Sequence, residues 1–510
     1  MHCFKNLTYV NGFDTENLNN GRQNNYAWSM SELGDYIYVG TGRNILVNLI
    51  TAIFANTNIP ALIKPTPDVD NEAEIWRFRK DGALPWQKVY PNDLVQSDLF
   101  GFRFMINHRP FGGSPCIYAA GYGNNVQILK TTNGVDWFIL DSSSVLQGSS
   151  SRAMVSHNGK IYISTVNALN QRSAPLLYSS PDPEFYPWEL LIDPSKPGFD
   201  PNKNPQNAIS NMAVFNNRLY VATSSPDGVQ VWRTNGEEPQ MNEWTRIVDS
   251  GFGNPANWFT LAMGVFKNHL YVSATKPLPL AWFIPMGCDI IRIDKNDNWE
   301  LVVGGNPLIS PNSSVNENYR SLSRLGSGFN NPFNVYGWQI QEFMGKLLVS
   351  TFDDSSNMEV ILTTLLANRQ LLEQRFNPKI IGIIIEVYRA IVGILRTIRY
   401  PIGFDLYISE DGTRFSPVFL NGLGNPNNYG GRILFVDSDN KLYIGTANPF
   451  QGCEVWTSAR IPYRGWEKHD HNYYRCLWQI REILSEKYDI LSENMPAIFD
   501  YILKNNSINI

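Results

Sequence analysis

Short segments in which apolar and polar residues alternate recur along the chain, and this period of two predicts β-strands. One phrase repeats: an apolar strand, a turn with Asn or Gly, a strand like LYVxT, a strand like VWR, and a strand that contains Trp. Its clearest copy covers residues 211–248. Such repetition of one supersecondary unit is typical of a repeat architecture.

The second strand of the phrase sets the register of the copies. It reads YIYVGT (36–41), CIYAAG (116–121), KIYIST (160–165), RLYVAT (218–223), HLYVSAT (269–275), KLLVST (346–351) and KLYIGT (441–446). In six copies a fourth strand follows, at Trp86, Trp137, Trp188, Trp244, Trp299 and Phe415. The seventh copy has no such strand after residue 458.

These seven copies predict an all-β fold, a single seven-bladed β-propeller over residues 1–458. One four-stranded blade cannot bury both of its faces, so neighbouring blades stack into a ring. The segment Phe4–Val10 resembles the outer strands. We expect it to close the last blade and so to pair both edges of the ring. Two β-sandwiches in tandem are an alternative that explains seven equivalent repeats less well.

Three copies are interrupted between their second and third strands, at about residues 42–72, 277–287 and 354–402. The last insertion has apolar residues at helical spacing and reads as two helices that break near Asn377-Pro378. Connections of this kind lie on one face of a propeller, so we expect the insertions to converge over one mouth of the channel. They could plug the channel, dock another chain or cover a small-molecule pocket. Residues 459–510 are predicted to be a helical extension packed on the outside of the ring.

Composition narrows the class of protein. The 510 residues are 43% apolar and 17% charged, which excludes a disordered chain. The net charge of −5 without a basic run argues against nucleic-acid binding. No stretch supplies about 20 uncharged apolar residues, so no transmembrane segment is predicted. Five scattered cysteines and the lack of a signal sequence favour a cytoplasmic setting, and the pattern indicates no metal site and no identifiable cofactor.

One equivalent position of the innermost strands holds candidate ligand-binding residues. Arginine occupies it in three copies, at Arg103, Arg152 and Arg432. Three guanidiniums at one channel would repel one another unless they face an anion or carboxylates. We therefore expect them either to bind an anionic group, such as a carboxylate or phosphate, or to pair with nearby acids or loop carbonyls.

Further candidates should lie at the same rim of the channel. Asp353 follows a second strand and could act as general base, hold a cation or pair with Arg43. Tyr336 and Tyr429 precede innermost strands and could donate hydrogen bonds or simply pack. The full candidate set is Arg103, Arg152, Arg432, Arg43, Asp353, Tyr336, Tyr429, Trp28 and Trp338.

The phrases VFNNRLYVAT, GVQVWRT and GGRILF…KLYIGTANPFQGCEVW resemble a broad group of bacterial seven-bladed propeller repeat proteins, most of them of unknown function. The resemblance covers most of residues 1–458 and implies the fold. One branch of the group is similar to the propeller part of enzymes that alkylate resorcinols or carboxylates with secondary alkyl chlorides. Their functional residues cannot be assigned to positions of this sequence, so no catalytic role is carried over.

Two functional hypotheses follow. In the first, the propeller is a scaffold whose capped face binds a partner protein or an apolar ligand. In the second, it is an enzyme acting on an apolar small molecule with an anionic head, for example in a C–C or C–O bond-forming alkylation. The head would then meet the three arginines, and the tail would meet the insertions near Phe54, Trp282 and Phe283. A closed pocket lined by the arginines favours the second hypothesis, whereas arginines paired with acids favour the first.

Overall fold

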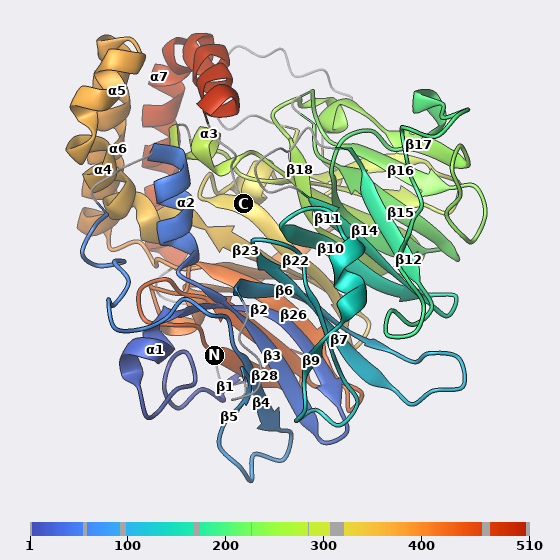
Figure 1. The fold of residues 1–510 in the computed structure, drawn as a ribbon. Helices are drawn as coiled ribbons and strands as arrows, with labels where there is room; N and C mark the ends of the chain where they lie inside the picture. Colours follow the sequence, from blue (N-terminus) through green and yellow to red (C-terminus); the bar gives the residue numbers. More distant parts are fainter. Residues whose placement is uncertain are drawn as a thin grey trace.

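The computed structural model describes residues 3–54, 59–91, 98–166, 174–225, 227–283, 285–305, 321–461 and 470–505. In the described part of the chain, consecutive strands pair antiparallel in groups, most of them four-stranded (Figure 1). Three groups are separate sheets, and single residue pairs join the others into one 16-stranded sheet. The first sheets along the chain are β2 (Asn24–Leu33), β3 (Tyr36–Arg43), β4 (Ile75–Arg79) and β5 (Gln87–Tyr90), then β6 (Leu99–His108), β7 (Cys116–Gly123), β8 (Ile128–Thr131) and β9 (Phe138–Ile139), then β10 (Ser150–His157), β11 (Lys160–Val166), β12 (Leu176–Ser180) and β13 (Glu189–Leu190).

The later sheets repeat this order. They are β14 (Ile209–Phe215), β15 (Arg218–Thr223), β16 (Gln230–Thr234) and β17 (Trp244–Val248), then β18 (Phe259–Phe266), β19 (His269–Thr275), β20 (Asp289–Asp294) and β21 (Trp299–Val303), then β22 (Asn334–Phe343), β23 (Lys346–Asp353), β24 (Asp405–Ser409) and β25 (Phe415–Leu420), and finally β26 (Gly430–Val436), β27 (Leu442–Ala447) and β28 (Val455–Ser458). The short N-terminal strand β1 (Lys5–Asn6) pairs antiparallel with β28, with Lys5 opposite Thr457.

The first strands of the sheets form a ring. Contacts run from β2 through β6, β10, β14, β18, β22 and β26, and β26 contacts β2. The apolar face of each sheet packs on its neighbour, so the tyrosines of the second strands, such as Tyr118 and Tyr162, are almost fully buried. This burial holds the sheets together without hydrogen bonds along most of their shared faces. The arrangement confirms the predicted β-propeller architecture.

A polar latch recurs where a sheet begins. Asn257 lies just before β18, and its side-chain amide donates to the Gly251 carbonyl at 2.9 Å and to Asp289 Oδ2 at 2.8 Å. Gly251 has a φ of 61°, which a glycine adopts without strain. The same pairs of bonds are made by Asn24 to Gly12 and Glu74, Asn334 to Gly328 and Asp405, and Asn428 to Gly422 and Glu454. Each latch ties the innermost strand of a sheet to its third strand and to the preceding connection.

The sequence carries a signal for three of these latches that the strand pattern did not reveal. The segments GFGNPAN, GFNNPFN and GLGNPNN, at residues 251–257, 328–334 and 422–428, all begin with the latch glycine and end with the latch asparagine.

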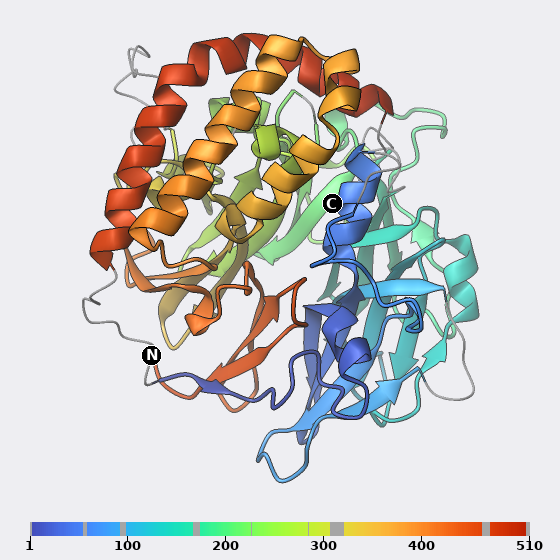
Figure 2. The same ribbon diagram turned by 90° about the vertical axis from the view of Figure 1, so that its left-hand side faces the viewer.

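Helices cover one face of the ring, as expected for the three insertions (Figures 1 and 2). The first insertion contains α2 (Ile45–Phe54) and the second contains α3 (Leu278–Phe283). The third contains α4 (Met358–Ala367), α5 (Arg369–Arg375) and α6 (Pro378–Ile398). Asn377 caps α6 by accepting from the backbone N–H of Lys379, so the helix begins where Asn377-Pro378 predicted a break. A further break at Asn368 separates α4 from α5.

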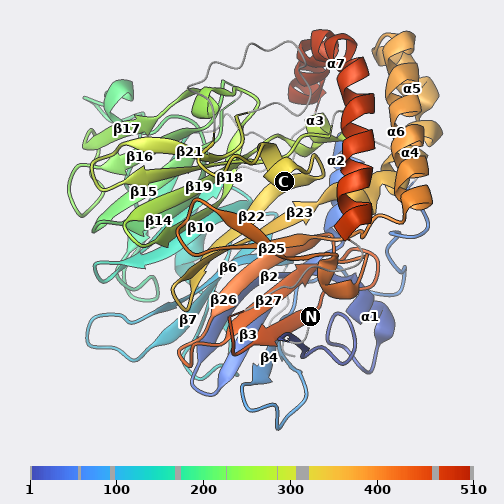
Figure 3. The ribbon, with the colours of Figure 1, turned by 180° about the vertical axis from the view of Figure 1, so that it is seen from behind.

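The C-terminal helix α7 (Asp470–Asn505) does not lie on the outside of the ring, where the sequence analysis expected it. It packs against α6 and contacts α3, so it belongs to the helical cap over the channel (Figure 3). The apolar residues Tyr473, Leu477, Ile480 and Leu484 are buried in this contact. A short helix, α1 (Leu18–Gln23), precedes β2. None of the helices in the described part of the chain is long and apolar enough to cross a membrane.

Candidate functional site

A cavity of about 120 Å³ lies between the innermost strands and the helical cap. Six of the residues singled out from the sequence line it: Arg103, Arg432, Tyr336, Tyr429, Trp28 and Trp338. The cap contributes Ile45, Leu46 and Leu49 from α2, with Leu278 and Trp282 from α3. The cavity therefore has a wall of guanidiniums, phenols and indoles, and an aliphatic wall supplied by the insertions. Trp282 was expected near this place, whereas the side chains of Phe54 and Phe283 are outside the described residues.

The position of Arg103 depends on its neighbours in the adjacent sheets. The Trp28 ring from β2 lies against Gly101 of β6, where a Cβ atom would overlap the indole. Two residues further along β6, the guanidinium of Arg103 stacks on that same indole, with Cζ 4.5 Å from the ring centroid. The Tyr122 ring, which packs edge-on against Trp28, has its centroid 5.5 Å from the same Cζ. A stacked guanidinium is held by cation–π attraction and cannot swing freely out of the site.

The same arrangement occurs again between the β22 and β26 strands. The Trp338 ring lies against Gly430, and the Cζ of Arg432 is 5.4 Å from the Trp338 centroid. Each arrangement pairs a Tyr-x-Trp segment of one strand with a Gly-x-Arg segment of the next, and we call it a Trp–Arg half-site. The first half-site consists of Trp28 and Arg103, and the second of Trp338 and Arg432. The glycine of Gly-x-Arg is a sequence signal that the analysis above did not use.

The arginines at the cavity have no counter-charge. Within the described ranges, Arg103, Arg152 and Arg432 have no carboxylate within 4.0 Å and make no hydrogen bond, and Nε of both Arg103 and Arg432 is buried without an acceptor. Burial lowers the pKa of Arg103 to about 10. Burial and the charge of Arg103 lower the pKa of Arg432 to about 9. The charged forms of these groups are thus less stable here than in water.

Arg152 does not line the cavity, although its charge acts there. Burial lowers its pKa, and the charges of Arg103 and Arg432 lower it further. The three arginines expected to share the channel are therefore electrostatic neighbours, with two at the cavity wall and one beside it.

Neutral phenols complete the polar wall. The hydroxyls of Tyr26 and Tyr429 hydrogen-bond each other, and burial raises the pKa of Tyr26 to about 12. The Tyr336 hydroxyl is buried and has no hydrogen-bond partner in the described part of the chain, and burial raises its pKa as well. At neutral pH these groups are protonated, so the Tyr336 hydroxyl is a donor whose hydrogen bond is unmet among the described residues. Tyr26 was not among the sequence candidates.

Two of the candidate residues lie elsewhere. Asp353 accepts from the Ser355 backbone at 2.8 Å, from Asn331 Nδ2 at 2.9 Å and from the Tyr400 hydroxyl at 3.2 Å. It lies beside Asp405, under the contact between α7 and the ring, and it does not line the cavity. Burial raises the pKa of Asp353 to about 6, and burial with the Asp353 charge raises that of Asp405 to about 7.

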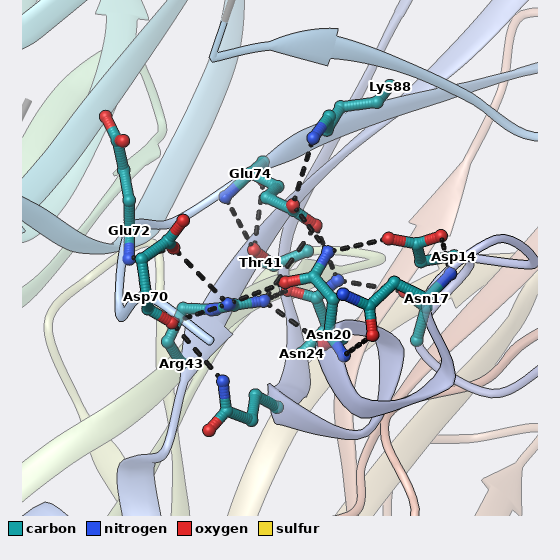
Figure 4. Close-up of polar contacts among 12 residues, drawn as sticks. Asp14, Asn17, Asn20, Asn24, Thr41, Arg43, Asp70, Glu72, Glu74 and Lys88 are labelled. Carbon is teal, nitrogen blue, oxygen red and sulfur yellow. Dashed lines mark hydrogen bonds and ion pairs between the residues drawn. The ribbon is translucent and has the colours of Figure 1, made fainter. Parts of the chain in front are cut away.

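Arg43 is also away from the cavity, and it is not paired with Asp353. Its side chain is fully buried and donates to Asn20 Oδ1 at 2.8 Å, Asn24 Oδ1 at 2.9 Å and the Asp70 carbonyl at 2.8 Å (Figure 4). The carboxylates of Asp70 and Glu74 lie at 3.6 and 4.0 Å. Arg43 therefore fastens the N-terminal segment and the first insertion to β3, which is a structural role.

The described residues hold no group of three or more His, Cys, Asp or Glu side chains that could bind a metal ion. What the cavity offers is positive charge, hydrogen-bond donors and apolar surface. That combination can bind an anionic group attached to an apolar body.

No family model matches the chain, and no curated protein matches it. Among solved structures it is similar to a putative 6-phosphogluconolactonase from Bacteroides fragilis, with 8% identity over 75% of this chain and 85% of that one, at a TM-score of 0.37. It is also similar to a putative 6-phosphogluconolactonase from Bacteroides uniformis, with 12% identity over 64% and 78%, at a TM-score of 0.34. A puromycin-hydrolyzing peptidase from Mycobacterium tuberculosis shares 10% identity over 89% of this chain and 56% of its own, at a TM-score of 0.43.

Proposed function

We propose that this chain is a seven-bladed β-propeller closed by its N-terminal strand, and that it binds a small molecule with an anionic head and an apolar body. The ligand lies in the cavity beneath the helical cap. Its head meets the guanidiniums of Arg103 and Arg432, and its body meets α2 and α3.

The unpaired arginines carry this proposal. Arg103 and Arg432 are each 7% exposed, yet neither has an acidic partner among the described residues. Burying a charge without a partner costs several kcal/mol, on the order of 3 or more. Elsewhere in the chain buried cations are paired, as Lys276 is with Asp289 at 3.1 Å and Lys130 with Asp182 at 3.1 Å. A bound anion would supply the charge that the cavity arginines lack.

The apolar wall supports the second half of the proposal. Leu46 and Leu49 of α2 face the cavity together with Leu278 and Trp282 of α3. The two helices come from two of the three insertions between second and third strands, and the third insertion carries α4, α5 and α6. An apolar group of the ligand would gain about 25 cal/mol for each Å² it removes from water there.

The scaffold hypothesis expects a filled channel and arginines paired with protein acids. The cavity and the unpaired guanidiniums favour a small-molecule site instead. A reaction at this site, such as the alkylation considered from the sequence, would be a later step that begins with the same binding event.

Native mass spectrometry of the protein purified from its own host tests the proposal. The wild-type protein is expected to retain an anionic small molecule, and the triple variant R103Q/R152Q/R432Q is expected to lose it without a fall in melting temperature. A matched control is R246Q, because Arg246 also lies over an indole, that of Trp232, but is half-exposed and 3.4 Å from Asp249. Retention by the triple variant, or a retained ligand without negative charge, would refute the proposal.

A further inference from the structure

The two Trp–Arg half-sites are built alike although they come from different pairs of sheets. Tyr26-Ala27-Trp28 faces Gly101-Phe102-Arg103, and Tyr336-Gly337-Trp338 faces Gly430-Gly431-Arg432. In both, the glycine lets the indole lie on the backbone, and the arginine two residues later stacks on that indole.

Both half-sites open into the same small cavity. Arg103 and Arg432 line it together, so their positive charges repel each other there, and this repulsion contributes to the lowered pKa of Arg432. Two separate anions in about 120 Å³ would repel each other strongly at short range. One shared anion would relieve the repulsion between the guanidiniums.

We propose that one head group bridges Arg103 and Arg432, and that the ligand is a compact monoanion with two acceptor oxygens, a carboxylate on a body about the size of one ring. This inference rests on the proposed function and specifies its ligand class.

The donors available fit a carboxylate. Both arginines line the cavity, and Nε of each is buried without an acceptor, so the hydrogen-bonding capacity of each guanidinium is unmet among the described residues. A guanidinium edge and a carboxylate match as two parallel hydrogen bonds, and a carboxylate has enough lone pairs to accept from both arginines. The unpartnered hydroxyl of Tyr336 is a further donor at the same wall.

The size of the cavity limits the body of the ligand. A dry cavity of about 150 Å³ in another protein accommodates benzene. The cavity here is smaller, about 120 Å³, and partly open, so it holds the carboxylate and the inner part of one ring while the outer part of the ring extends toward the opening. Its walls include Trp28, Trp338 and Tyr122, whose rings favour edge-to-face or stacked contacts with a planar group.

Charge separates a carboxylate from a phosphate ester. Only two of the three arginines line the cavity, and Arg152 lies beside it. A dianionic phosphate loses more hydration energy on entering such an apolar site than a carboxylate does. We therefore expect a carboxylate to bind more tightly than a phosphate ester with the same ring.

Isothermal titration calorimetry with benzoate, benzamide and phenyl phosphate tests this inference. One benzoate is expected to bind per chain, and benzamide, its neutral counterpart, at least about tenfold more weakly. R103Q and R432Q should each weaken benzoate binding at least about tenfold. The double variant should be little worse than either single variant, because a bridging head group needs both arginines. Thermal melts show whether each variant is folded.

Lysine variants separate charge from geometry. R103K and R432K keep the positive charge and lose the planar fork, so they should recover only part of the benzoate affinity lost in the Gln variants. Full recovery would show that the paired N–H edge is not used and would overturn the bridging geometry.

The other outcomes distinguish the two proposals. Binding of two benzoates per chain would overturn the proposal of a shared head group and leave an anion site. The same holds if R432Q binds benzoate as tightly as the wild-type protein does. Tighter binding of phenyl phosphate than of benzoate would overturn the carboxylate class in the same way. If neither anion binds more tightly than benzamide, and the protein from its host retains no anion, the proposed function itself fails.

Discussion

Arg103 lies on the face of Trp28, with its Cζ 4.5 Å from the ring centroid and its Nε buried without an acceptor. The indole holds the guanidinium in place, but it does not neutralise the charge. This uncompensated charge is electrostatically unfavourable, and a bound anion would offset it. It therefore predicts opposite effects of one substitution on stability and on binding.

The variant R103M should be more stable than the wild-type protein and should lose ligand. Methionine keeps much of the aliphatic volume and removes the unpaired charge, and replacing buried charges by apolar groups is often stabilising by about 1–4 kcal/mol. Urea unfolding of ligand-free protein measures the gain. The control R246M, at the half-exposed Arg246–Asp249 pair, should change stability by no more than about 0.5 kcal/mol. A less stable R103M would show that Arg103 has a structural partner.

Benzoate affinity should depend on pH in the alkaline range. The lowered pKa values, about 9 for Arg432 and about 10 for Arg103, mean that the two guanidiniums lose positive charge above pH 9 when no anion is bound. Affinity should be constant from pH 7 to pH 8 and then fall by up to about tenfold per pH unit. The neighbouring phenol of Tyr26, with a pKa of about 12, stays neutral over this range. Calorimetric titration at pH 7, 8, 9 and 10 measures the profile, and constant affinity up to pH 10 would contradict it.

The buried acid pair under α7 should make the fold less stable as pH rises. The pKa values of about 6 for Asp353 and about 7 for Asp405 exceed the ordinary aspartate value of about 3.9, so the native state holds protons that the unfolded chain releases. Stability therefore falls from about pH 4 to pH 7 as the pair becomes charged. In D405N the amide oxygen can still accept from Tyr473 and Asn334, which bond Oδ2 in the wild type. Thermal melts from pH 5 to pH 8 should show a smaller decline for D405N.

The matched control for that experiment is D289N. Asp289 has the same latch position in the β18 sheet, but it is paired with the buried Lys276 at 3.1 Å. Its replacement leaves a buried lysine without a counter-charge and should cost about 3–5 kcal/mol. If D405N and the wild type show parallel pH profiles, the acid pair is not the source of the pH dependence.

The latch asparagines should contribute more to the stability of the fold than the residues beside them. N428A removes the bonds from Asn428 to the Gly422 carbonyl and to Glu454, which leaves two buried acceptors short of a donor. Such a loss costs about 1–3 kcal/mol. The adjacent Asn427 is only half-buried, and its side chain makes no hydrogen bond within the described part of the chain. The stability of N427A should therefore lie within about 0.5 kcal/mol of the wild type. Equal effects in chemical denaturation would show that the latch does not stabilise the ring.

Repetition made much of the site predictable. Because each copy has the same strand order, Arg103, Arg152 and Arg432 could be aligned at one position of the innermost strands before any contact was known. Trp28 and Trp338 could be placed at that position too, and Tyr336 and Tyr429 just before it. What the alignment lacked was Gly101 and Gly430, which explain why each indole can lie against the next strand.

Residues at the ends of loops were placed less well. Arg43 and Asp353 both follow a second strand, and position alone suggested a shared rim. Arg43 instead donates hydrogen bonds to Asn20 and Asn24 of the N-terminal segment. Asp353 accepts a hydrogen bond from Tyr400 and lies beside Asp405. Strand periodicity carries no information about which loop folds over which strand end. For the same reason, the helical pattern of α7 did not indicate that this helix packs on the cap and not on the outside of the ring.

By itself, the sequence determined the repeating sheets, the order of strands within them and the insertions that rise on one face, because alternation and repeat spacing are local properties of the chain. Only the tertiary structure decided that two arginines stack on indoles from neighbouring sheets, that no described acid neutralises them and that α7 joins the cap over their cavity. Those facts depend on contacts between segments far apart in the chain, and such contacts are set by packing rather than by local pattern.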